Sequence, residues 1–288
     1  MKKLTSILFA LFLVSNCYSQ IKKVAIRSDG IELNAYMYQA VGDELKPTII
    51  WCHGNPGGKE EGKSEFAKRL NKHGINVLRF NYRGLWGTPG IFTPGNSQKD
   101  LKNILNFILQ DDISLKYRID TTRIVVAGYS HGSNVTIVSA LHDDRINEII
   151  CLGLADYSLL NREFFNPDNI EMKKFNQEAL EAIWGGEIYG QGKYASDFDK
   201  FVMDMLFNNY KYDFVAQADK LMGKRIYIIV GMNDVTGPIE KHFFPLYREL
   251  KKIGHENFDY EITESDHGFQ ELFDGTLSNM IAEWIQEK

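Results

Sequence analysis

Short apolar runs alternate along the chain with stretches in which apolar residues recur every three or four positions. Near the N-terminus, residues 22–28 and 31–38 have the pattern of strands, and Asp29-Gly30 between them predicts a hairpin turn. Further strands are predicted at residues 47–52, 75–80, 124–127, 149–155, 225–230 and 258–263. Helical spacing is found in residues 65–73, 100–109, 240–253 and 276–287. This order predicts an α/β fold with a mostly parallel central sheet and helices on both faces.

Residues 157–223 interrupt this alternation. The segment is rich in Phe, Tyr, Asn and Lys, and it contains helical stretches such as residues 171–184 and 198–208. Ordinary crossover structure is the alternative, but a single crossover helix needs far fewer residues. We therefore expect a helical cap inserted between two strands of the sheet.

The strand at 124–127 runs directly into Gly128-Tyr129-Ser130-His131-Gly132, which fits the pattern G-x-S-x-G of a nucleophile elbow. A sharp turn from strand to helix strains the backbone at the serine and requires small residues two positions before and after it. The small-residue stretch 133–141 can continue as a helix, whose N-terminus favours developing negative charge. Ser130 is therefore the candidate nucleophile.

A serine hydroxyl becomes a good nucleophile when a nearby base takes its proton, and the chain offers seven histidines. His267 follows the last predicted strand, at the carboxyl edge of the sheet, and is the candidate base. His53 and His131 also lie near that edge. However, His131 directly follows the nucleophile and should point away from it, and we expect His53 to brace its loop. The others are expected to be solvent-exposed: His73, His142, His242 and His255.

The base needs a carboxylate to orient its far nitrogen. Asp234 follows the predicted strand 225–230 at the same edge and is the candidate acid. Asp156 follows strand 149–155 and remains the alternative. Asp266 is adjacent to the histidine in sequence and would have difficulty facing its ring.

An oxyanion formed at the serine needs preorganised N–H donors. One candidate is the backbone N–H of His131, directly after the nucleophile, and the other should come from the loop after strand 47–52. Pro56 has no N–H, so Asn55 is the candidate there. A phosphate-binding glycine loop is disfavoured, because neither GxxxxGK[ST] nor GxGxxG occurs.

The N-terminus has the pattern of a signal peptide. Met1-Lys2-Lys3 is a positive region, residues 7–14 are apolar, and cleavage before Gln20 would leave small residues at −3 and −1. The apolar run is short for a membrane anchor. A lipoprotein anchored at Cys17 is the alternative, although Asn16 departs from that motif. We expect a signal peptide at 1–19, an exported protein, periplasmic or secreted, and membrane attachment only if Cys17 is lipidated.

Composition adds further limits. The net charge of −5 gives no basic surface for nucleic acid. No linker, repeat or low-complexity tract divides residues 20–288, so we expect one domain with its cap at 157–223. Cys52 and Cys151 remain after cleavage and fall in strands that should not be neighbours, which predicts two buried free thiols.

From about residue 30 onward, the chain resembles an α/β-hydrolase. The resemblance is carried by His53-Gly54-Asn55-Pro56-Gly57, Asn81-Tyr82-Arg83-Gly84, the elbow, Gly231-Met232-Asn233-Asp234 and Asp266-His267-Gly268-Phe269, with Ser, Asp and His in the family's order. Residues 83–90 also resemble a loop of peptidase-like and feruloyl-esterase-like members. Asn55 and Ser133 depart from residues common in the family, and neither change removes a catalytic group.

The resemblance implies a serine hydrolase that cleaves a carboxylic ester through an acyl-enzyme, with Ser130, His267 and Asp234 as a catalytic triad. Alternatives are a small serine peptidase acting on short peptides and a non-catalytic hydrolase-like binding protein. No metal or organic cofactor is implied, and the oligomeric state is not predicted. We expect some cap aromatics to line an acyl pocket while most pack the cap onto the sheet: Phe164, Phe165, Trp184, Tyr189, Phe201 and Phe207.

Overall fold

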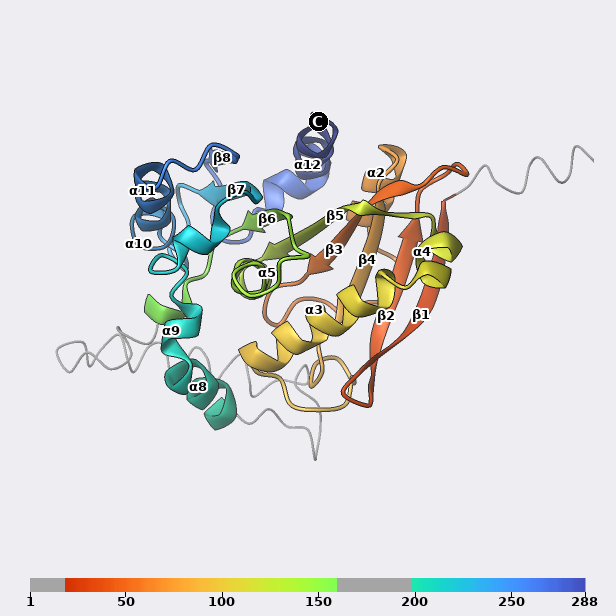
Figure 1. Cartoon of the computed structure of the whole chain (residues 1–288), viewed down its shortest axis with the longest axis horizontal. Helices are drawn as coiled ribbons and strands as arrows, with labels where there is room; N and C mark the ends of the chain where they lie inside the picture. The colour runs from red at the N-terminus through yellow and green to blue at the C-terminus, as the bar shows by residue number, and fades with distance from the viewer. Residues whose placement is uncertain (1–18, 160–197, 288) are drawn as a thin grey trace, which may run out of the picture.

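The computed structural model describes residues 19–159 and 198–287 (Figure 1). The predicted signal peptide and much of the predicted cap lie outside these ranges. Of the six cap aromatics, Phe164, Phe165, Trp184 and Tyr189 are among the residues that are not described.

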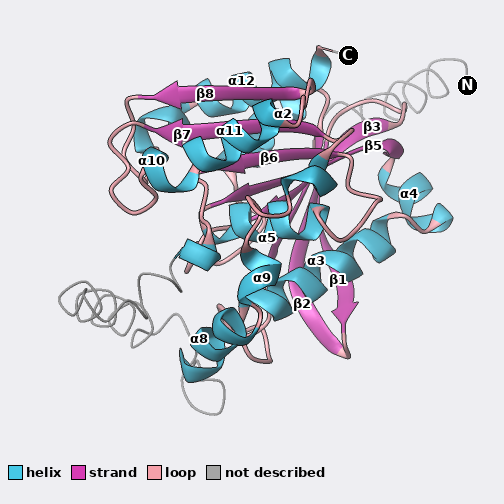
Figure 2. Cartoon of the chain, turned by 60° about the vertical axis from the view of Figure 1, so that its left-hand side comes forward, coloured by secondary structure: helices cyan, strands magenta, loops and turns pink. Residues whose placement is uncertain are grey.

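The described part of the chain contains an eight-stranded sheet in the order β1-β2-β4-β3-β5-β6-β7-β8 (Figures 1 and 2). Its strands are β1 (Gln20–Ser28), β2 (Ile31–Gln39), β3 (Lys46–Cys52), β4 (Asn76–Asn81), β5 (Ile119–Tyr129), β6 (Glu148–Leu152), β7 (Arg225–Gly231) and β8 (Phe258–Thr263). β1 pairs antiparallel with β2, and β2 antiparallel with β4. All other pairs are parallel. The predicted fold class is confirmed.

Alternate side chains of the parallel strands enter two hydrophobic cores, one on each face of the sheet. One core is closed by α3 (Pro94–Ile108), α5 (His131–Ala140), α8 (Phe198–Phe207) and α11 (Phe244–Lys252). The other is closed by α2 (Glu65–Lys72) and α12 (Thr276–Gln286). The short elements are α4 (Asp111–Tyr117), α9 (Asn209–Tyr212), α10 (Ile239–His242) and the 3₁₀ turns η2 (Ala218–Leu221) and η3 (Gln270–Asp274). Burial on both faces explains the apolar runs of the central strands.

The largest differences from the predicted elements concern helix ends. The helix predicted at 100–109 begins at Pro94, because Thr93 caps its N-terminus by accepting a hydrogen bond from Asn96 N and proline suits the first turn. The helix predicted at 240–253 is two helices, α10 and α11, with Pro245 in the first turn of the second. Proline has no N–H to continue a preceding helix. α4 was not predicted.

The hairpin prediction is confirmed, since Asp29 and Gly30 have φ values of 50° and 81°. Cys52 and Cys151 are buried and free, as predicted, because β5 separates their strands.

Two histidine predictions are wrong. His242 and His255 are buried, and His255 Nε2 donates to the carbonyl of Leu221. None of the described helices is long and apolar enough to cross a membrane.

Candidate active site

Ser130 lies at the junction of β5 and α5 with φ 54° and ψ −116°, a strained conformation for a residue with a side chain. Gly128 and Gly132, two residues before and after Ser130, must be glycine because a side chain at either position would collide with backbone atoms. A Cβ atom on Gly128 would lie 2.0 Å from the carbonyl oxygen of Gly132, and one on Gly132 would lie 1.9 Å from that of Cys52. The elbow therefore packs backbone to backbone against the start of the loop after β3.

We expect Gly132→Ala to lower the free energy of unfolding by about 3 kcal/mol, because the added methyl group meets backbone that cannot move aside. Gly58→Ala, in the loop after β3, is the matched control: its Cβ would contact nothing within 4 Å, and we expect a change within about 0.5 kcal/mol. Urea unfolding of both variants measures the difference. Equal stabilities would contradict the steric requirement at the elbow.

The structure brings Ser130, His267 and Asp234 together in one hydrogen-bonded chain. His267 Nδ1 lies 2.7 Å from Asp234 Oδ2, and His267 Nε2 lies 2.9 Å from Ser130 Oγ. A carboxylate can only accept, so Nδ1 carries the proton in this arrangement and Nε2 of the neutral ring accepts from the serine hydroxyl. His267 is thus held in the tautomer that can receive a proton from Ser130.

The loops after β7 and β8 are joined by their backbones, which sets Asp234 beside His267. Met232 N donates to Thr263 O at 2.8 Å, and Asn233 N donates to Ser265 O at 3.0 Å. A Cβ on Gly231 would lie 2.3 Å from Ser265 O, so the close approach of the two loops requires glycine at that position. The 33 residues that separate acid and base in sequence are bridged by this adjacency.

Asp234 is held as an anion by its surroundings. Its side chain is nearly fully buried, and Oδ1 accepts hydrogen bonds from the backbone N–H groups of Thr236 at 2.9 Å and Gly237 at 2.7 Å. Burial by itself would raise the pKa of this carboxyl. The hydrogen bonds from His267 and the two backbone donors outweigh it and hold the pKa of Asp234 below its ordinary value.

Asp156, the alternative acid, makes different contacts. Its Oδ1 accepts from Ser158 N at 2.8 Å, and its own N–H donates to His242 Nδ1 at 3.0 Å. Burial raises the pKa of Asp156 to about 6, because the hydrogen bonds it accepts do not offset its loss of hydration. The structure thus places Asp234, and not Asp156, on His267.

The raised pKa of Asp156 predicts a pH-dependent loss of stability. An ordinary Asp side chain titrates near pH 4, so the folded protein holds this proton more tightly than the unfolded chain. The resulting stabilisation is present below pH 4 and is lost as the pH rises through about 6. Between pH 4 and pH 8, we expect the free energy of unfolding of wild type to fall by about 2 kcal/mol relative to that of Asp156→Asn. Urea unfolding at the two pH values tests this, and a pH-independent difference would contradict it.

Asn55 lies in the loop after β3, which packs on the elbow. A Cβ on the preceding Gly54 would lie 3.3 Å from Ser130 Cβ. Trp86 holds this loop by donating from Nε1 to Pro56 O at 2.9 Å. The sequence pattern did not indicate this role of Trp86.

Further along, a buried carboxylate fixes the same loop to the sheet. Glu60 accepts from Arg79 Nε at 2.6 Å and from the hydroxyl of Tyr38 at 2.5 Å. Asn81 accepts from Glu60 N at 2.8 Å and donates to Gly58 O at 3.0 Å. The loop that holds Asn55 is therefore anchored at both its start and its end.

His131 points away from the nucleophile, as predicted, into a buried aromatic cluster. Its Nδ1 lies 2.6 Å from the hydroxyl of Tyr157 and its Nε2 lies 3.0 Å from Ser97 Oγ. Burial, with a smaller contribution from His53, lowers the pKa of His131 to about 3, so the ring stays neutral. Because His131 opens α5, its backbone N–H has no partner within the helix.

Ser133 stands where a third elbow glycine is common, and its hydroxyl has a structural role. Ser133 Oγ donates to Ser130 O at 2.6 Å and accepts from Ala155 N at 3.1 Å. It thus ties the first turn of α5 to the chain leaving β6.

Two aromatic residues of the predicted cap are described, and they differ in burial. Phe201 of α8 is buried and stacks on Phe92, with ring centroids 5.5 Å apart, near His131. Phe207 is 79% exposed. Phe201 therefore packs its helix onto the main core, and Phe207 faces solvent.

Among the described residues, no group of three or more His, Cys, Asp or Glu side chains could hold a metal ion.

One more contact orients the candidate base. The hydroxyl of Tyr129, the residue before the nucleophile, donates to His267 O at 2.7 Å. The variable position of G-x-S-x-G thus helps to hold the loop of His267, which no sequence signal indicated.

A family model described as BD-FAE matches residues 33–176, half of the chain. The chain belongs to the BD-FAE family. The matched segment of this BD-FAE protein contains Ser130, while Asp234 and His267 follow it in sequence. The predicted resemblance to α/β-hydrolases with esterase-like and peptidase-like members is confirmed.

Named relatives of this BD-FAE protein are distant. It is 25% identical over 131 residues to the quorum-quenching protein AidA of Acinetobacter baumannii. The aligned region covers 44% of this chain and 41% of AidA. It is 29% identical over 137 residues to protein bem46 of Schizosaccharomyces pombe, and the aligned region covers 46% of this chain and 43% of bem46. The matches span less than half the length of these curated relatives.

Solved structures show the same fold over most of the chain. An acylaminoacyl peptidase of Pyrococcus horikoshii is similar with a TM-score of 0.66 and 18% identity, covering 96% of this chain and 43% of the other. Est1E from Butyrivibrio proteoclasticus is similar with a TM-score of 0.63 and 18% identity, covering 92% and 98%. At such low identity, these likenesses show the fold alone.

Proposed function

We propose that this BD-FAE family member is a serine hydrolase that cleaves a carboxylic ester through an acyl-enzyme. The observation that carries the proposal is the hydrogen-bonded chain from Ser130 through His267 to Asp234, on a strained elbow. This arrangement meets the geometric requirement of a nucleophile within reach of a base that a carboxylate orients.

The reaction begins with transfer of the Ser130 hydroxyl proton to His267 Nε2 as Oγ attacks the ester carbonyl. Asp234 stabilises the imidazolium that forms, and His267 then donates the proton to the departing alkoxide. Water, deprotonated by the same histidine, then attacks the acyl-enzyme, and His267 returns that proton to Ser130 Oγ as the acid is released. No metal or organic cofactor takes part in these steps.

The oxyanion of each tetrahedral intermediate is held by the backbone N–H groups of His131 and Asn55. The position of His131 at the start of α5 supports its part, because the first N–H groups of a helix lack intrahelical partners and attract negative charge. The packing of the loop after β3 on the elbow supports the part of Asn55. The anchoring of that loop by Trp86 and Glu60 provides the preorganisation that oxyanion stabilisation requires.

The substrate class is a small carboxylic ester, in line with the esterases among similar folds. The same triad geometry also serves amide hydrolysis, and one similar structure is an acylaminoacyl peptidase. A panel of aryl esters of increasing acyl length, assayed beside aminoacyl anilides, separates the two activities. We expect turnover of the esters, and turnover of the anilides alone would replace the esterase assignment by a peptidase.

Covalent labelling distinguishes an enzyme from a hydrolase-like binding protein. A fluorophosphonate should modify Ser130, because the reagent requires a serine activated by a neighbouring base. Mass spectrometry of the digested protein identifies the labelled residue. Absence of labelling in folded protein would favour the binding protein.

The protein is exported, with residues 1–19 removed before Gln20. The positive start, the short apolar run and the small residues Cys17 and Ser19 support this assignment. N-terminal sequencing of protein from fractionated cells tests it. A chain that begins at lipid-modified Cys17 would instead show a lipoprotein, and an intact Met1 inside the cell would contradict export.

A further inference from the structure

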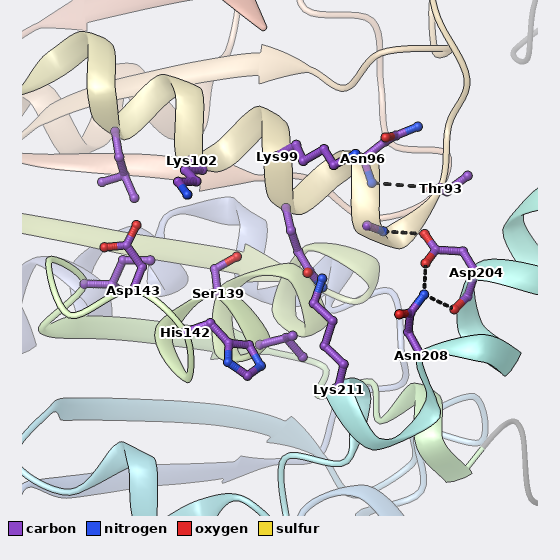
Figure 3. Close-up of a pocket in the computed structure, with 15 residues that line it drawn as sticks. Thr93, Asn96, Lys99, Lys102, Ser139, His142, Asp143, Asp204, Asn208 and Lys211 are labelled. Atoms are coloured by element: carbon purple, nitrogen blue, oxygen red, sulfur yellow. Dashed lines mark hydrogen bonds between the residues drawn. The ribbon is translucent and has the colours of Figure 1, made fainter. Parts of the chain in front are cut away.

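A cavity of about 520 Å³ lies between α3, α5 and the α8–α9 pair (Figure 3). Ser130, His267 and Asp234 do not line it. Its volume is in the range of small-molecule sites, and nothing in the proposed esterase mechanism uses it.

The cavity gathers cationic side chains. Lys99 and Lys102 are three residues apart on α3 and so share one face of that helix, while Lys211 extends from α9 toward α3 (Figure 3). Within the described parts of the chain, no carboxylate oxygen lies within 4.0 Å of any of the three ammonium groups. Burial lowers the pKa of Lys211, which shows that its ammonium loses hydration without full compensation.

The two acidic residues that line the cavity are engaged elsewhere. Asp204 accepts from Gly95 N at 2.7 Å, from Asn208 Nδ2 at 2.8 Å and from the Tyr212 hydroxyl at 3.1 Å. Asp143 forms an ion pair with Arg145 at 2.6 Å. These contacts orient the carboxylates within local networks, so that, among the residues the structure describes, neither carboxylate forms an ion pair with Lys99, Lys102 or Lys211.

Neutral donors also lack partners there. Gln98 is only 8% exposed and lines the cavity, and its buried Nε2 has no hydrogen-bond partner among the described residues. The buried hydroxyl of Ser139, on α5, likewise has no hydrogen-bond partner within residues 19–159 and 198–287. An unsatisfied buried polar group costs free energy, so groups of this kind indicate a ligand that would satisfy them.

The lining also contains apolar side chains toward one end. Leu105 lies at the far end of α3 from Gly95, and Val138 and Ile146 line the cavity with it. The cavity is thus too large for a bare oxyanion and is partly apolar.

We infer that this cavity binds a phosphate group, carried by a small organic monoester. Three ammonium groups and two neutral donors match the charge and the many acceptor sites of a phosphate dianion better than those of a single carboxylate. Leu105, Val138 and Ile146 would contact the organic part. The site does not depend on the proposed esterase activity.

Calorimetric titration of the full protein with inorganic phosphate and with phenyl phosphate, at constant ionic strength, tests the site. We expect saturable binding of both, tighter for phenyl phosphate. Lys211→Gln should weaken binding roughly tenfold to a hundredfold, because it removes a charge-assisted contact. Lys252→Gln is the matched control, since Lys252 is exposed and pairs with Glu249, and it should leave the affinity unchanged.

A second variant separates binding from folding. Gln98→Leu keeps the charge and removes the unpaired amide, so it should raise the unfolding temperature of the free protein and weaken phosphate binding. Absence of saturable binding to wild type, or equal weakening by Lys252→Gln, would overturn the inference. Equal affinities for the two ligands would make free phosphate the occupant and overturn the monoester. Ester turnover by Ser130 is measured separately, so failure of either proposal leaves the other standing.

Discussion

Replacement of Ser130 by alanine should abolish the burst of acylation and lower ester turnover by about 10⁴- to 10⁶-fold. The hydroxyl is the only group of the site that forms the acyl bond in the proposed mechanism, and His267 would then have no proton to accept. The oxyanion donors remain, so some rate enhancement over water should persist. Pre-steady-state kinetics with a chromogenic ester measures both the burst and the later rate.

Ser133→Ala is the matched control for this variant. It also removes one hydroxyl of the elbow, but the hydrogen bonds of Ser133 Oγ are to backbone atoms of Ser130, Gly153 and Ala155, whereas His267 Nε2 is bonded to Ser130 Oγ. A burst should therefore remain in this variant. Near-full turnover by Ser130→Ala would refute the mechanism.

The second large effect concerns the acid. Asp234→Asn should lower turnover by about 10⁴-fold with little change in substrate binding, because an amide neither stabilises the imidazolium nor enforces the tautomer of His267. Circular dichroism should show an intact fold. Steady-state kinetics then separates kcat from KM.

Asp156→Asn provides the comparison, since it removes a buried carboxylate that follows the neighbouring strand and makes no hydrogen bond to His267. We expect a much smaller loss of turnover. The reverse ranking of the two variants would move the acid to Asp156, while Ser130 and His267 kept their roles.

Much of the fold follows from local sequence pattern. Strands buried on both faces need apolar residues at consecutive positions, and a hairpin turn with two positive φ values needs residues such as Asp29 and Gly30. The elbow is local only in part: Gly128 is required by contact with Gly132 O four residues further on, whereas Gly132 is required by contact with Cys52 O at the end of β3. The strand pattern, the hairpin and Gly128 depend on short-range sterics and periodicity, which sequence alone expresses.

Tertiary structure decided the contacts that side chains make across long separations. Two aspartates follow neighbouring strands, and only the joined loops after β7 and β8 place Asp234 rather than Asp156 on His267. His242 and His255 were expected in solvent because they fall on predicted helices or in turns, yet packing of other elements buries them. The partners of His131 are 26 and 34 residues away, and no local pattern specifies them. The sequence by itself determined which residues could perform the chemistry, whereas the orientation of loops at the sheet edge determined which of them meet, because that orientation depends on the packing of the whole sheet.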